Sequence, residues 1–388
     1  MKTPLFGSQP ASPTSSAAQP VQIAYVAQPG LGSIAISNFF LNLITLWIYR
    51  FWAKTRVRRH IWSSVHVNGE PLEYTGTGKE LFLGFVIVLA VIFLPLALIG
   101  VALSVYYGPE SAASIAYTYL IALALSTMYG FAIYRARRYR LSRTLWRGIR
   151  GALPGSAISY SGKYFGSLLL SPITAGWSSP AMNLILAEQM TNDMRFGNTP
   201  FSFTGRAGPL YTRYALCWFL TLFVYLGLIG IAIGLYSSGA FDSLQNVLKA
   251  IDGEGNYLPD YMKGLIVFAG FLAIILFLLL FATLRSIIWS FYTAKELNLF
   301  AQYTRFPGTR FEFNATPWSL ITLWLGNMAL IIFTLGIAQP FVEQRIMRYF
   351  VDRLTIEGAV DFSSVGQSQA AIDKRGEGLI DALNLDAF

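Results

Sequence analysis

The sequence predicts an all-α polytopic membrane protein: an internally repeated helical bundle with small cytoplasmic β-hairpins between its membrane segments. Three observations support this prediction, namely the composition, a set of long uncharged apolar runs and a recurring short motif. Of the 388 residues, 54% are hydrophobic and 13% are charged, whereas a soluble domain carries about 25% charged residues. Alternation of apolar and polar residues is absent from the apolar runs, which argues against a membrane β-barrel.

The two ends of the chain are polar. Residues 1–21 are rich in Pro, Ser and Ala, and we expect a disordered tail there. Residues 365–388 are expected to form a polar, solvated C-terminal tail. The alternative is one short amphipathic turn against the membrane or the protein body, formed by Leu379, Ile380, Leu383 and Phe388.

Residues 22–364 are predicted to form a repeated membrane domain that contains two kinds of segment. Two pairs of uncharged runs can each cross about 30 Å of hydrocarbon as helices; the pairs are 81–107 with 112–134, and 214–236 with 264–284. Three single segments contain amides, prolines or glycines, and they lie at 31–49, 164–187 and 316–342. The order along the chain is therefore single, pair, single, pair, single.

Basic residues predict which way these segments face. Eight basic residues and no acidic residue lie between Arg135 and Lys163, and the positive-inside rule makes that stretch cytoplasmic. The acidic connection 237–262 is predicted to face outward. Arginines beside the spans are candidates for orienting the chain and for contacting anionic lipid headgroups; they are Arg56, Arg59, Arg137, Arg138, Arg345 and Arg348. Nucleic acid is not an expected partner, because these arginines directly flank apolar segments.

A short motif with a central aromatic residue recurs between the segments. It reads "LEYTGTGKELF", "ISYSGKYFG", "FSFTGRAG", "FEFNATPW" and "VDFSSVGQ". The stretches "VHVNGEPLEY", "MRFGNTPFSF" and "LTIEGAVDF" each place a Gly between two alternating runs, a pattern typical of small β-hairpins. "TLWIYRFWAKTRVRR" from Thr45 aligns with "TLGIAQPFVEQRIMR" from Thr334. Such self-similarity indicates an internal repeat.

These residues resemble the YjgN family of bacterial inner-membrane proteins, a domain-of-unknown-function family. The resemblance depends on "LITLWIYRFWAKTRVRR" followed by "LEYTGTGKELFLGF", echoed by "IFTLGIAQPFVEQRIMRYF" and "GEGLIDAL", and it covers the chain from about residue 22 onward. It implies a multi-pass protein of the bacterial inner membrane and no established activity. The departures are Pro172, Pro180 and the long acidic connection.

Two topologies fit the single segments. If each segment crosses the membrane, the chain contains inverted repeats like those of many secondary transporters. If each dips in and returns, with breaks at "TLWIY", "TAGWSSP" and "TLGIAQP", all hairpins and arginine clusters stay cytoplasmic. We favour the re-entrant topology, which requires these segments to pack within protein or beside a water-filled cavity.

Candidate functional residues are polar groups inside the single segments. Asn38 lies seven residues before Thr45, and Asn327 lies seven before Thr334. These groups either make helix–helix hydrogen bonds or line a central intramembrane site. Arg285 is expected to extend to the membrane interface, and Glu80 to stabilise a helix N-terminus.

Three functional classes remain. Transport or lipid handling through a polar site between repeats ranks narrowly first, and a membrane scaffold or assembly factor that acts through cytoplasmic hairpins ranks second. A membrane enzyme is third, because no usual catalytic, nucleotide-binding or metal-binding motif is present in the sequence. The protein is therefore expected not to be an enzyme and to use no cofactor or metal. Membrane lipids with anionic headgroups on the cytoplasmic side are the expected partners.

Overall fold

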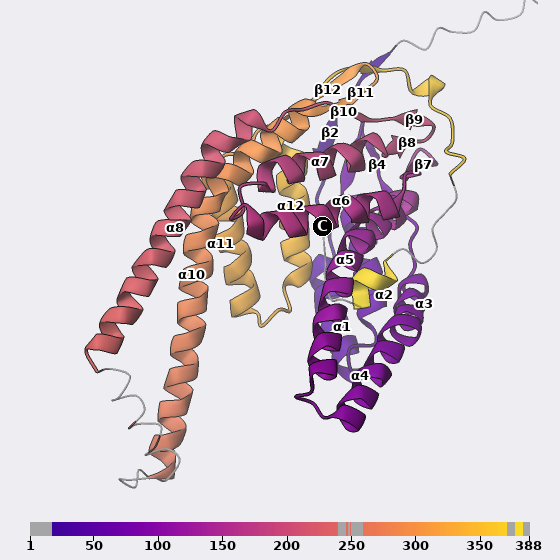
Figure 1. Ribbon diagram of the computed structural model, residues 1–388. Helices are drawn as coiled ribbons and strands as arrows, with labels where there is room; N and C mark the ends of the chain where they lie inside the picture. The colour runs from indigo at the N-terminus through magenta and orange to yellow at the C-terminus, as the bar shows by residue number, and fades with distance from the viewer. Residues whose placement is uncertain (1–17, 240–245, 247–248, 250–258, 371–376, 383–388) are drawn as a thin grey trace, which may run out of the picture.

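The computed structural model describes residues 18–239, 246, 249, 259–370 and 377–382. The predictions for residues 1–17 and for most of the acidic connection therefore lie outside the described residues. Helices make up most of the described chain, and short antiparallel strands gather at one end of them (Figure 1).

In the described part of the chain, four helices are long and apolar enough to cross a membrane, judged by length and composition. They are Gly78–Tyr107, α5 (Ala112–Arg143), α8 (Gly208–Ser237) and α10 (Asp260–Tyr303). The first consists of α3 (Gly78–Val88), a π-helical turn η1 (Leu89–Phe93) and α4 (Leu94–Tyr107). The π-turn ends two residues before Pro95, which has no N–H group to complete an α-helical bond.

Each single segment lies in a unit of two helices joined by a five-residue turn, although in the first unit the second helix begins at Arg50, beyond the predicted bounds 31–49. The pairs are α1 (Leu31–Ile44) with α2 (Arg50–Ser63), α6 (Ala157–Ile173) with α7 (Ser179–Asn192), and α11 (Pro317–Phe333) with α12 (Gln339–Arg353). The chain thus reverses at the three stretches where the sequence predicts breaks. We call these units the three helical hairpins.

One side chain organises the same turn in all three helical hairpins. The Thr334 hydroxyl donates to the Leu330 carbonyl (2.6 Å) and accepts from the Ala338 N–H (3.1 Å). Thr45 and Thr174 make the equivalent pairs of bonds. Each turn then enters the left-handed region, where Gly176 and Gly336 have φ of 86° and 84°. Glycine adopts this conformation without steric cost.

The strands form three antiparallel sheets. One has the order β1 (Gln19–Pro20), β13 (Leu354–Val360), β12 (Thr309–Phe313), β11 (Thr304–Phe306), β10 (Ser202–Phe203). The second joins β2 (Ile23–Tyr25), β3 (Val65–Val67) and β4 (Glu70–Pro71). The third runs β5 (Glu73–Tyr74), β6 (Thr144–Trp146), β7 (Ile149–Ala152), β8 (Arg195–Phe196), β9 (Thr199–Pro200).

The hairpin predicted at "LTIEGAVDF" is wrong, because these residues belong to the continuous strand β13, which pairs with β12 from Leu354 to Gly358. Gly358 has a φ of 109° and lies so close to the backbone of Gly308 that a Cβ atom would not fit. The glycine therefore permits close strand approach, where the sequence pattern suggested a turn. Gly69 and Gly148, in contrast, do occupy hairpin turns, after Asn68 and Arg147 that also have positive φ.

The expected solvated C-terminal tail is wrong for its described part. After a 3₁₀ turn, η2 (Phe362–Ser364), the helix α13 (Gly378–Ala382) packs on α3 and α5. Leu379 is buried among apolar side chains of these helices, as the amphipathic alternative predicts. Leu383 and Phe388 lie outside the described residues.

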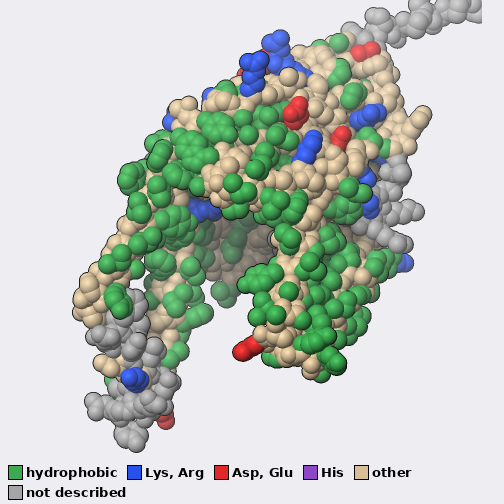
Figure 2. All heavy atoms as spheres, viewed as in Figure 1, with side chains coloured by type: hydrophobic (Ala, Val, Ile, Leu, Met, Phe, Trp, Pro, Cys, Tyr) green, Lys and Arg blue, Asp and Glu red, His purple; other side chains and the backbone are tan. Residues whose placement is uncertain are grey.

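The long helices form two legs that extend away from the strands (Figure 1). We call α3, η1, α4 and α5 the first leg, and α8 with α10 the second leg. Apolar side chains cover both legs, and the molecule is hollowed between them (Figure 2). We call the opposite end, which carries the sheets, the strand end.

Candidate functional site

A cavity of about 690 Å³ opens where the second leg meets two helical hairpins. Its lining comes from α7, α8, α10, α11 and Ile346 of α12. We call it the α10–α11 cavity, because these two helices supply most of its residues. It is lined by Ser179, Asn183, Tyr214, Arg285, Ser286, Trp289, Ser290, Tyr292, Thr293, Leu320, Leu323, Trp324, Asn327 and Ile346.

Two buried polar atoms in this lining have no hydrogen-bond partner among the described residues. They are the Asn327 carbonyl oxygen Oδ1, an acceptor, and the Trp289 ring nitrogen Nε1, a donor. Asn327 is 9% exposed. An unsatisfied buried donor or acceptor costs about 1–3 kcal/mol. The cavity thus presents one donor and one acceptor whose bonding capacity the protein itself does not use.

Arg285 is the one charged residue among the described residues of the lining, and it forms no ion pair with any of them. It directly follows the uncharged run 264–284 on α10. The cavity therefore combines a cation and a few polar groups with aromatic and aliphatic walls, a composition common in small-molecule sites.

One rim of the cavity is fixed by a carboxylate. Glu296 Oε1 accepts hydrogen bonds from the Tyr292 hydroxyl (2.7 Å) and from Asn183 Nδ2 (2.9 Å). These bonds connect α10 with α7 and hold two lining side chains in place. Glu296 itself is not among the lining residues, and its carboxylate holds Tyr292 and Asn183 at the rim of the cavity.

The four predicted polar residues occupy different positions. Asn327 lines the α10–α11 cavity, whereas Asn38 lies between α1 and α2 and donates weakly from Nδ2 to the Ala53 carbonyl (3.4 Å). Thr45 and Thr334 use their hydroxyls inside the turns of their own helical hairpins. Of the four, the structure brings only Asn327 into this lining.

The predicted headgroup arginines are at the surface or bond to nearby backbone. Arg137 and Arg345 are exposed. Arg56 donates to the Ser37 hydroxyl (3.0 Å), Arg59 to the Gly76 carbonyl (2.8 Å) and Arg348 pairs with Asp352 (3.2 Å). Arg138 donates to the carbonyls of Leu153 and Gly155. Lipid contact by these arginines stays a prediction.

A second polar cluster was missed by the sequence reasoning. Glu377 and Asp381 of the C-terminal segment pair with Arg58 (2.6 Å) and Lys54 (2.8 Å) of α2. The partners are more than 300 positions apart in sequence, so no local pattern links them. The sequence does contain one local indication of this cluster. Glu377 and Asp381 are four residues apart, which places both acids on one face of a helix.

Glu80 has a wider role than the predicted one. The N-cap of α3 is Thr77, whose hydroxyl accepts from the Glu80 N–H. The Glu80 carboxylate accepts from Arg143 (2.6 Å) and from the Tyr139 hydroxyl (2.9 Å), and thereby joins α3 to α5.

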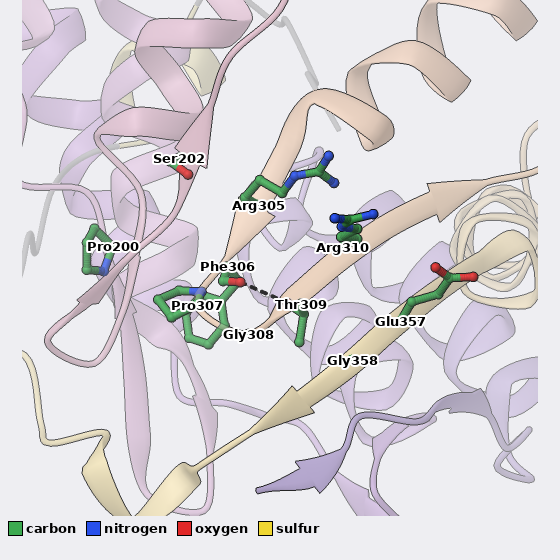
Figure 3. A pocket seen from close by; sticks show the side chains of 10 residues that line it. All are labelled: Pro200, Ser202, Arg305, Phe306, Pro307, Gly308, Thr309, Arg310, Glu357 and Gly358. Carbon is green, nitrogen blue, oxygen red and sulfur yellow. Dashed lines mark hydrogen bonds between the residues drawn. The ribbon is translucent and has the colours of Figure 1, made fainter.

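An open concavity of about 750 Å³ lies on the sheet at the strand end (Figure 3). Arg305 and Arg310 face each other across β11 and β12, and Thr309 donates to the Phe306 carbonyl (3.2 Å). None of the unpaired buried side-chain atoms found in the described residues belongs to the lining of this concavity. The α10–α11 cavity is the better candidate site for this reason.

Comparisons with known proteins give a family and one related protein. Residues 30–382 match the family model described as "Bacterial protein of unknown function (DUF898)". The chain is also similar to "Inner membrane protein YjgN" of Salmonella typhimurium, with 38% identity over 66 residues, which is 17% of each chain. No solved structure matches the chain.

Proposed function

Because the chain belongs to the DUF898 family of bacterial proteins of unknown function, the family of YjgN, we propose that it is a multi-pass inner-membrane protein that handles lipid by binding an anionic amphiphile in the α10–α11 cavity. The protein named YjgN is described as an inner-membrane protein. The long apolar helices of this chain support the same location here.

The observation that carries the proposal is the pair of unused polar atoms beside a cation. Asn327 Oδ1 and Trp289 Nε1 have no hydrogen-bond partner among the described residues and can accept and donate one bond each, and the exposed Arg285 guanidinium adds a positive charge to the same lining. A phospholipid headgroup supplies phosphate oxygens for Arg285 and Trp289, and a hydroxyl or ammonium group for Asn327. The guanidinium is well suited to phosphate because its N–H groups match phosphate oxygens in pairs.

The position of Arg285 supports a lipid over a water-soluble ligand. The residue ends an uncharged run of 21 residues, so it lies near the membrane boundary when α10 spans the bilayer. Under the positive-inside orientation this is the inner boundary. Apolar walls from Leu320, Leu323 and Trp324 extend the site toward acyl chains.

The scaffold alternative predicts a packed core without a cavity. The α10–α11 cavity counts in favour of lipid handling, and the strands of the strand end pair with one another within the chain. We therefore place lipid handling first.

The test is native mass spectrometry of the full chain extracted with its surrounding lipids, with the double variant Arg285→Gln, Asn327→Leu. We expect an anionic lipid that stays bound to the wild type after bulk lipid is removed, and loss of that lipid in the variant. The matched control is Arg305→Gln, which removes an exposed arginine at the strand end. Equal retention in wild type and double variant, or no retained lipid in either, contradicts the proposal.

A further inference from the structure

Three cations of α2 and α5 lie around the acidic side chains of residues 377–382, a segment that packs on α3 and α5. Arg58 Nη1 lies 2.6 Å from Glu377 Oε2, and Lys54 Nζ lies 2.8 Å from Asp381 Oδ1. Arg140 Nε approaches the other Glu377 oxygen at 3.6 Å. Arg58 is 8% exposed and Glu377 is 2% exposed. We call Lys54, Arg58 and Arg140 the basic recess.

The basic recess is a built anion site with further polar support. The Arg58 guanidinium also donates to the Tyr74 hydroxyl at 3.2 Å, which holds the cation toward the acid. Arg140 Nε is buried and makes no hydrogen bond within the described residues. The basic recess therefore retains one N–H donor, on Arg140 Nε, that does not hydrogen-bond to the Glu377 carboxylate.

The bound segment resembles an amphiphile in its chemistry. Next to the Glu377 carboxylate, Leu379 packs with Ala132 and Ala136 of α5, in contact with Val88 and Ile92 of the first leg. Gly378 lies so close to the backbone of Gly84 that a side chain would not fit there. The Glu377 carboxylate thus meets cations, and the Leu379 side chain beside it meets apolar residues of the first leg.

The energetics allow another anion to compete for this site. The desolvation of buried charges offsets most of their attraction, so buried ion pairs add little net stability while an unpaired buried cation is costly. α13 has only five residues, and among its described side chains Leu379 is the one that joins an apolar cluster. Release of Glu377 alone would leave Arg58 and Arg140 as unpaired buried cations. An incoming anion that pairs with both arginines removes this cost.

We propose that the basic recess is a second binding site, that its ligand is an anionic phospholipid, and that α13 is an internal competitor for it. The recess faces the leg helices α3 and α5 and lies beside the basic stretch that begins at Arg135. A lipid reaches it from the membrane surface on that side. This inference does not depend on lipid binding in the α10–α11 cavity.

The experiment measures the accessibility of α13 in the full chain. The chain carries Cys217→Ala and Leu379→Cys, and maleimide labelling of position 379 is followed in nanodiscs. Three samples are compared: phosphatidylcholine alone, phosphatidylcholine mixed with phosphatidylglycerol, and phosphatidylcholine with added inorganic phosphate. We expect labelling to be severalfold faster with phosphatidylglycerol and unchanged with phosphate.

Two variants in the same background identify the recess as the cause. Glu377→Gln weakens docking and is expected to speed labelling in every lipid mixture. Arg58→Gln is expected to remove the phosphatidylglycerol effect, whereas Arg305→Gln, at an exposed arginine of the strand end, leaves it in place. Hydrogen exchange of residues 377–382 in the unsubstituted chain checks that Leu379→Cys does not itself release α13.

Equal labelling in both lipid mixtures overturns the proposal and makes α13 a structural plug. An equal effect of inorganic phosphate overturns the assignment to lipid. An effect of phosphatidylglycerol that survives Arg58→Gln also overturns it, because the lipid then acts elsewhere.

Discussion

At the scale of single residues, two asparagine amides differ in how much of their hydrogen-bonding capacity the described residues use. Asn298 uses its whole amide, since Nδ2 donates to the Ala315 carbonyl (2.9 Å) and Oδ1 accepts from the Ala315 N–H (2.8 Å). Asn327 Oδ1 has no hydrogen-bond partner among the described residues. Both asparagines lie within long helices, so the sequence could not tell them apart. Only the positions of neighbouring backbone groups distinguish the two.

This contrast gives a prediction on stability. Replacing Asn298 by Leu leaves the Ala315 backbone groups without partners and is expected to lower the free energy of unfolding by about 1–3 kcal/mol. Asn327→Leu removes an unsatisfied oxygen and is expected to leave stability unchanged or raised by about 1 kcal/mol. Denaturation of the two variants in the same detergent measures both effects. A larger loss for Asn327→Leu than for Asn298→Leu contradicts this assignment.

Asp381 gives a prediction on pH dependence. Burial raises the pKa of its carboxyl above the ordinary value, although Lys54 acts in the opposite direction. The docked state therefore binds the proton more tightly than the released state. Docking of α13 is strongest at low pH, and it weakens as the pH rises above the ordinary pKa of about 3.9 and through the raised value.

A spin label at Ala382, in a Cys217→Ala chain, measures this effect. We expect its mobility to increase as the pH rises through that window, and Asp381→Asn to remove the dependence. Mobility that decreases with rising pH contradicts the stated sign.

At the scale of elements, hydropathy predicts the long helices well and the short ones poorly. All four predicted runs lie in helices that continue beyond them. For example, the predicted run covers 264–284, whereas α10 covers Asp260–Tyr303. Apolar composition marks only the part that faces lipid, so it cannot show where such a helix ends. The three breaks were visible because Thr, Gly and Pro interrupt apolar runs. α13 was predicted only as the amphipathic alternative to a solvated tail, because five residues have too little periodicity of their own and depend on distant cations.

The repeated turn leads to a prediction for Thr334. Thr334→Val removes the hydroxyl that bonds to Leu330 and Ala338, and we expect a loss of about 1 kcal/mol in stability. Thr334→Ser keeps the hydroxyl and is expected to retain most of that stability. Thermal unfolding of both variants in nanodiscs measures the difference, and equal losses would show that the hydroxyl is unimportant.

The tip of the third helical hairpin tests insertion into the bilayer. Leu335 is 90% exposed in the isolated chain, which is costly for a leucine in water and favourable in hydrocarbon. Leu335→Asp is expected to destabilise the protein in nanodiscs by up to about 3 kcal/mol. Val26→Asp, at an exposed residue just after β2, is the matched control, with little expected change. Equal effects of the two substitutions would place the tip in water.

At the scale of the whole molecule, two legs and three helical hairpins share one strand end (Figure 1). Because each helical hairpin reverses, its two ends lie near the sheets, and this agrees with the favoured re-entrant topology. Charge predicts the orientation from the sequence, since a single rule relates arginines to the inner face. The two sites could not be predicted in the same way, because each is assembled from helices that are distant along the chain. Both proposed sites require the strand end to lie inside the cell.

Labelling of single cysteines in intact spheroplasts tests that orientation most directly. In a Cys217→Ala chain, we place cysteine at Glu110, between α4 and α5 at the tip of the first leg, and at Arg147 and Arg305 in hairpins of the strand end. A reagent that cannot cross the membrane is expected to reach position 110 and to reach positions 147 and 305 only after lysis. Labelling of 147 or 305 in intact spheroplasts, with 110 protected, contradicts the account.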